Sequence, residues 1–246
     1  EPLAGFIFLS TLFLYGLHRI VGLQKVQAFT DHGRYRVIQH FRGHIWVYST
    51  VGAVGAAVLF FYLQRQTQWT LIVPALLSVA YVLPLFGQER RLRDFHWVKI
   101  FLIALVWSAV TVLLPGVEHF YWLSVPLWLL FLERCFFIFA ITIPFDIRDL
   151  KVDAYTVVKT LPGHLGIRRS KRLAYASLLL MVGMAAVSLW LDFYTWKVFA
   201  ALSLSALISG VLVAFCDQVE HDYYFTGLMD GMMLLQASLV GLTAFL

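Results

Sequence analysis

The sequence predicts an all-α protein, a bundle of transmembrane helices that forms one domain over residues 1–246. Of the 246 residues, 61% are hydrophobic and only 13% are charged, and the mean hydropathy is +0.79. Soluble domains are usually about 45–50% apolar and about 25% charged. The apolar residues also gather in runs long enough to cross about 30 Å of hydrocarbon as helices. Composition and run length therefore both indicate an integral, multi-pass membrane protein.

Eight apolar runs are predicted to span the membrane, and they show no internal repeat of the kind that many transporters carry. The two cysteines, Cys135 and Cys216, lie in apolar runs and have no disulfide or metal-ligand spacing. No secretory signal peptide is expected, because the first run lacks a basic leading segment. The predicted spans are residues 3–23, 44–63, 69–86, 95–114, 118–143, 173–191, 196–216 and 224–246.

Most of the 19 Lys and Arg residues lie in three connections, at residues 24–43, 87–99 and 144–172. Eight alternating spans place all three connections on one side of the membrane. Loops rich in Lys and Arg usually stay in the cytoplasm, so we expect the basic side to be cytoplasmic. Such a face suits anionic membrane lipids or a phosphorylated amphiphile whose tail stays in the bilayer. We expect no nucleic-acid partner, and the sequence leaves the oligomeric state open.

Three carboxylates, Asp146, Asp149 and Asp153, follow directly after about 25 mostly apolar residues. Their spacing places all three on one face of a helix, where like charges repel. A divalent cation among them would explain the arrangement, and Mg²⁺ prefers one or two carboxylates together with the oxygens of a substrate phosphate. The alternative is an acidic helix end that is solvated at the membrane surface and neutralised by Arg148 and Lys151.

Two further charged residues, Glu133 and Arg134, lie near the middle of the fifth predicted span. Neighbouring residues of a helix point about 100° apart, so these two cannot simply pair with each other. Each needs a partner elsewhere, and Asp230 in the last span is a candidate partner for Arg134 or for Arg19. Alternatively, Glu133 positions an acceptor molecule or stabilises a cation.

The aspartate run resembles a known family motif. Asp146-Ile-Arg-Asp149-Leu-Lys-Val-Asp153, followed by Lys159-Thr-Leu-Pro and Leu165-Gly, is similar to the second aspartate-rich motif of the UbiA superfamily of intramembrane prenyltransferases. A second stretch, from Tyr81 to Trp107, resembles the tyrosine-proline, basic loop and lysine that the family has between its fourth and fifth helices. The order of elements also fits this resemblance if the chain lacks the family's first helix, in which case the eight predicted spans would be helices two to nine.

The resemblance implies a helical bundle around a cavity that opens to the membrane, in which Mg²⁺ bridges aspartates to a prenyl diphosphate. The prenyl (isoprenoid) group is then transferred to a lipophilic acceptor. By resemblance, the catalytic and metal-binding residues are Asp146, Asp149 and Asp153. The expected diphosphate contacts are Lys99, Arg90, Arg91 and Lys159, and Tyr81, Tyr15 and His18 are further candidates for substrate binding.

The family's first aspartate motif is missing at the end of the first span. This chain has Tyr15, Gly16 and Arg19 where the family has an asparagine and two aspartates. In one account Arg19 is catalytic and replaces a metal ion, either by pairing with a motif aspartate or by gripping the diphosphate bidentately. In the other account catalysis is lost, and the protein binds a prenyl lipid or a membrane partner. Glu220 or Asp222, from the acidic connection at 217–222, is a candidate replacement carboxylate.

Overall fold

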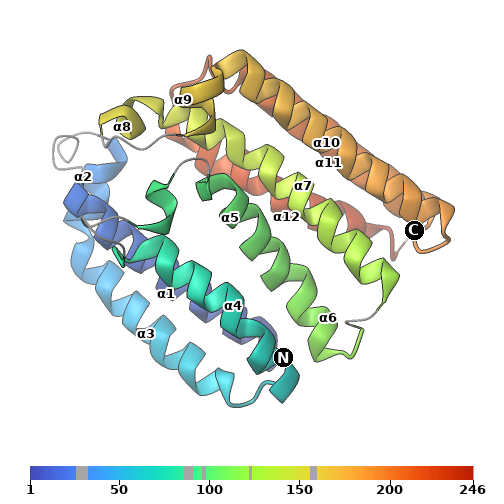
Figure 1. The fold of residues 1–246 in the computed structure, drawn as a ribbon, viewed down its shortest axis with the longest axis horizontal. Coiled ribbons are helices and arrows are strands. Elements are labelled where there is room, and N and C mark those ends of the chain that lie inside the picture. The colour runs from blue at the N-terminus through green and yellow to red at the C-terminus, as the bar shows by residue number, and fades with distance from the viewer. Residues whose placement is uncertain (26–32, 86–90, 96–97, 122–123, 156–159, 246) are drawn as a thin grey trace. The chain divides into compact units, whose positions relative to one another are not determined.

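In the computed structural model the described residues are 1–25, 33–85, 91–95, 98–121, 124–155 and 160–245. These ranges are almost entirely helical and contain no β-strand, so the predicted all-α class is confirmed (Figure 1). The chain folds as two compact units. The first comprises residues 1–99 and 114–121, and the second comprises residues 100–113 and 122–246.

Seven helical segments within the described ranges are long and apolar enough to cross a membrane. The predicted span 69–86 corresponds to α4 (Arg65–Val82), which is not among them. This helix ends at Val82 because the next residue, Leu83, is extended, and a residue that precedes a proline disfavours helical backbone. The seven segments are Pro2–Gly22, Arg42–Phe60, Val98–Glu118, Val125–Arg148, Ile167–Trp190, Trp196–Phe215 and Tyr224–Leu242.

The first unit is built on α1 (Pro2–Lys25) and α3 (Arg42–Phe60), whose backbones approach closely. A glycine permits this approach, because a Cβ atom on Gly52 would lie 2.8 Å from the carbonyl oxygen of Leu9 and 3.0 Å from the amide nitrogen of Phe13. Small residues at helix contacts are the usual means by which membrane helices pack closely. The unit also contains α2 (Gly33–His40), α4, the short helix η2 (Leu92–Asp94) and α6 (Leu114–Glu118).

The second unit is organised around α7 (Val125–Arg148), which packs against α10 (Figure 1). Phe137 and Ile143 of α7 are fully buried, in a core that they share with Met181 and Phe225. α7 is therefore the central helix of this unit. Its other elements are α5 (Val98–Ser108), the π-helical η3 (Ala109–Leu113), α8 (Leu150–Tyr155), α9 (Leu161–Leu165), α10 (Ile167–Trp190), α11 (Trp196–Phe215), the π-helical η4 (Tyr224–Met229) and α12 (Asp230–Leu242).

Candidate functional site

The aspartate motif lies at the junction of α7 and α8 in the second unit. Asp149 is the single residue between the two helices, and its carbonyl oxygen accepts a hydrogen bond from the amide of Asp153 at 2.8 Å. Asp146 and Asp153 are buried, with only 1% and 6% of their surface exposed. At these two positions the structure therefore does not have the solvated helix end that was the alternative prediction.

Arg148 engages the middle aspartate of the motif. Its Nε donates to Oδ1 of Asp149 at 2.8 Å, and its Nη2 donates to Oδ2 at 3.3 Å, so the contact is bidentate. The guanidinium carbon also lies 5.2 Å from the ring centre of Phe145 and 5.0 Å from that of Phe225. Arg148 interacts electrostatically with Asp230 as well. Neutralisation by Arg148, which the sequence offered as an alternative, is therefore found at Asp149.

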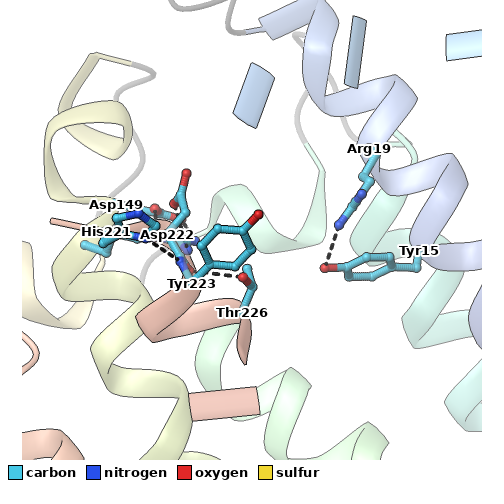
Figure 2. Close-up of polar contacts among 8 residues, drawn as sticks. Tyr15, Arg19, Asp149, His221, Asp222, Tyr223 and Thr226 are labelled. Carbon is cyan, nitrogen blue, oxygen red and sulfur yellow. Dashed lines mark hydrogen bonds and ion pairs between the residues drawn. The ribbon is translucent and has the colours of Figure 1, made fainter. Parts of the chain in front are cut away.

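The acidic connection at 217–222 brings a further carboxylate to this motif. Oδ1 of Asp222 lies 3.6 Å from Nη1 of Arg148, and Figure 2 shows Asp222 beside Asp149. The Oγ1 atom of Thr226 donates to the backbone carbonyl of Asp222 at 3.0 Å, which holds this part of the chain in place (Figure 2). Of the two residues predicted to supply a replacement carboxylate, Asp222 lies at the motif, and Glu220 is exposed.

The carboxylate oxygens of the motif are the type of donor that Mg²⁺ prefers. However, Arg148 already contacts both oxygens of Asp149, and the described part of the chain has no group of three His, Cys, Asp or Glu side chains placed to hold a metal ion. Mg²⁺ needs only one or two protein carboxylates when a substrate phosphate completes its coordination. The residues therefore fit a metal held by Asp146 or Asp153 with substrate oxygens, rather than a cage of three aspartates.

A cluster of cations lies in the first unit, around His18 of α1. Nη1 of Arg93 is 2.7 Å from Nε2 of His18, and its guanidinium carbon lies 5.3 Å from the ring centre of Tyr81. Because arginine can only donate, Nε2 of His18 must be the acceptor, and the remaining ring proton is on Nδ1. Arg91 and Lys99, both buried, also interact electrostatically with His18. We call His18, Tyr81, Arg91, Arg93 and Lys99 the cationic cluster.

The sequence predicted four of these five residues and missed the role of Arg93. The available signal was its place in the same basic loop as Arg91. Two other predicted diphosphate contacts, Arg90 and Lys159, lie outside the described residues.

Arg19, the residue that replaces an expected aspartate, contacts Tyr15. Its Nη2 donates to the hydroxyl of Tyr15 at 3.3 Å, and its guanidinium carbon lies 4.5 Å from the centre of the Tyr15 ring (Figure 2). Arg19 also interacts electrostatically with His18, so it borders the cationic cluster. The predicted pairing of Arg19 with Asp146 or Asp149 stays a prediction.

The charged pair in the middle of α7 has partners that differ from the predicted one. Nη1 of Arg134 donates to Oε1 of Gln236 at 2.5 Å, whereas Asp230 interacts with Arg148. The hydroxyl of Tyr194 donates to Oε2 of Glu133 at 3.1 Å. Burial and the neighbouring Glu133 carboxylate raise the pKa of Tyr194, so this hydroxyl keeps its proton. Asp230 is therefore not the partner of Arg134, and each charge on α7 has its own polar contact.

Comparison with known proteins bears on the fold. No family model and no curated protein matches the sequence. A solved structure of a digeranylgeranylglyceryl phosphate synthase in membranes matches with a TM-score of 0.58 and 14% sequence identity, over 96% of this chain and 81% of the other. The helices and this likeness define an integral, multi-pass membrane protein. More particularly, the chain shares the fold of that solved synthase, which agrees with the fold that the sequence motif predicted.

Proposed function

We propose that this protein is an intramembrane prenyltransferase that moves a prenyl group from a prenyl diphosphate to a lipophilic acceptor. The observation that carries the proposal is the burial of Asp146 at the end of a membrane-spanning helix and of Asp153 in the short helix that follows it. Buried carboxylates are costly, and ionisable residues kept at membrane spans usually serve function. The fold supports the same activity, because the similar solved structure is named as a synthase of a glyceryl phosphate that carries two geranylgeranyl groups.

Two groups of charged residues, one in each unit, suit such a reaction. Arg91, Arg93 and Lys99 would attract and bind the diphosphate, and contacts with His18 and Tyr81 hold the Arg93 guanidinium in place before substrate arrives. In the second unit, Asp146 or Asp153 would hold Mg²⁺, which would supply positive charge to a phosphate group.

The bond between the allylic carbon and the diphosphate oxygen then breaks, and the diphosphate leaves with the bonding electrons. The nucleophilic atom of the acceptor bonds to that carbon and loses its proton. An apolar surrounding protects the allylic cation from water during this step.

A second candidate function is a non-catalytic protein that binds a prenyl lipid or a membrane partner. Two observations favour it. Arg19 stands where the family has an acidic residue, and the Asp149 carboxylate is occupied by Arg148. Both features reduce the negative charge available to a metal ion.

The same proposal places the basic connections on the cytoplasmic side of the membrane. A cysteine introduced at the exposed Arg168 should then react with an impermeant reagent only from the cytoplasmic side. Labelling from the opposite side alone would reverse the orientation.

The test is the thermal stability of the detergent-purified protein with prenyl diphosphates of several chain lengths, with and without Mg²⁺. A ligand at a hundred times its dissociation constant stabilises the folded state by about 2.7 kcal/mol. We expect stabilisation that needs Mg²⁺ and is lost in the Asp146→Asn and Asp153→Asn variants. Arg169→Gln, a change at an exposed residue, is the control.

Stabilisation in the absence of Mg²⁺ would instead support Arg19 as the replacement for a metal. It should then disappear in Arg19→Ala. If no prenyl diphosphate stabilises the folded protein, the transferase proposal is wrong and the binding protein becomes the better candidate.

A further inference from the structure

Arg148 stands between two carboxylates that come from distant parts of the chain. It makes a bidentate contact with Asp149, and its remaining terminal nitrogen, Nη1, lies 3.6 Å from Asp222. The Arg148 and Asp149 side chains are 15% and 19% exposed, whereas that of Asp222 is 46% exposed. The guanidinium therefore makes a short, shielded contact with Asp149 and a longer, more exposed contact with Asp222.

This geometry makes Arg148 a strong competitor for the Asp149 carboxylate. Bidentate contacts between arginine and carboxylate are among the strongest charge-assisted hydrogen bonds. The aromatic rings of Phe145 and Phe225 lie within the distance at which a ring attracts a cation. Partial burial also reduces screening of the pair by salt. A divalent ion that approaches Asp149 must therefore displace a cation that is already well held.

Asp222 provides a second carboxylate that the displaced guanidinium can contact. At 3.6 Å it is too far from Nη1 for a direct hydrogen bond, so a rotation of the Arg148 side chain toward Asp222 would shorten this contact and lengthen the two contacts with Asp149. The backbone carbonyl of Asp222 accepts a hydrogen bond from Thr226, which supports the main chain at this position.

We propose that Arg148 is a positioning residue that controls the access of divalent metal to Asp149, and that it releases this carboxylate by shifting onto Asp222. The inference rests on the proposed function, in which Asp146 or Asp153 holds the metal, and it adds Asp149 as a ligand that becomes available only when Arg148 moves. It deepens that function, because Arg148 then determines how tightly the aspartate motif binds metal. Asp222 acts through Arg148 and is not itself a metal ligand.

The test uses Mn²⁺ alone as the probe, measured by the paramagnetic resonance signal of the free ion, with the full purified chain and no prenyl diphosphate. We expect Arg148→Gln to bind Mn²⁺ at least about tenfold more tightly than the original protein, because the competing charge is gone. Asp222→Asn should bind Mn²⁺ several-fold more weakly, since Arg148 then loses its second carboxylate contact and stays on Asp149. Arg169→Gln removes the same charge from an exposed site and should change the affinity by less than about twofold.

The double variant separates the two roles of Asp222. When Arg148 is already glutamine, Asp222→Asn should weaken Mn²⁺ binding less than it does in the original protein, because only the loss of a nearby negative charge remains. An equal or larger loss would show that Asp222 does not act through Arg148, which would overturn the proposed shift.

If a folded Arg148→Gln protein binds Mn²⁺ no more tightly than the original protein, the proposed role of Arg148 is wrong. The same conclusion follows if neither the original protein nor Arg148→Gln binds Mn²⁺. Folding of each variant is checked by its unfolding temperature. Failure of the transferase proposal would appear differently, as an absence of stabilisation by prenyl diphosphates while the Mn²⁺ affinities still follow the expected order.

Discussion

Gln236 of α12 is expected to stabilise the second unit through its contact with Arg134. Its side chain is 1% exposed, it accepts from Arg134 at 2.5 Å, and its Nε2 donates to the hydroxyl of Ser205 at 3.2 Å. Gln236→Leu keeps a similar volume but removes both contacts. A hydrogen bond to a charged group contributes about 1.5–3 kcal/mol. Measured side-chain hydrogen bonds between membrane helices are weaker, with an average near 0.6 and a maximum near 1.7 kcal/mol.

We therefore expect Gln236→Leu to lower the free energy of unfolding by about 2 kcal/mol, because it leaves the half-buried Arg134 guanidinium without this acceptor. The measurement is reversible unfolding of the purified protein in mixed micelles, as a double-mutant cycle with Arg134→Leu. The two changes should couple by about 1 kcal/mol or more, since once Arg134 is gone the loss of Gln236 costs less. Gln218→Leu, at an exposed position, is the matched control and should change stability by less than about 0.5 kcal/mol. Strict additivity of Arg134→Leu and Gln236→Leu would refute the contact as a source of stability.

Two more predictions concern packing and cysteine chemistry. Gly52→Ala should destabilise the α1–α3 pair by about 1–3 kcal/mol, because its Cβ would meet backbone atoms of Leu9 and Phe13, which cannot rotate away. Gly43→Ala, where a Cβ meets nothing within 4 Å, should be neutral or slightly stabilising in the same unfolding assay. Equal effects of the two changes would contradict the close approach of the helices. Burial raises the pKa of Cys216 to about 11, and the residue is 1% exposed. Its reactive thiolate is therefore scarce near neutral pH, and maleimide should modify Cys216 only after unfolding, as measured by mass spectrometry. Rapid modification of the native protein would contradict this burial.

The fold could largely be predicted from the sequence, because membrane spans depend on local composition. The main difference arose at α4, where Pro84 ends the helix before the apolar run ends. The motif at Asp146, Asp149 and Asp153 was also visible, since its spacing and its place after a span are properties of one continuous stretch.

The partners of the charged residues could not be predicted in the same way. Charge alone favoured Asp230 for Arg134, but a separation of six residues places Gln236 about 9 Å further along a helix. Only the register of α12 against α7 decides between them, and that register depends on packing. The contact of Arg148 with Asp222 likewise joins segments that are distant in the sequence. Arg93 lay in a loop with several cations, and nothing local distinguished it from Arg91.

The contact between Arg134 and Gln236 has a consequence for how the protein is made. The two residues are 102 positions apart, so the ribosome delivers α7 well before α12. Throughout that interval, a guanidinium in the middle of a membrane-spanning helix lacks the amide oxygen that later accepts from it. Completion of the second unit must therefore wait for synthesis of the last helix. Conditions that slow the insertion of α12 should lengthen the time during which the half-made protein is open to quality control.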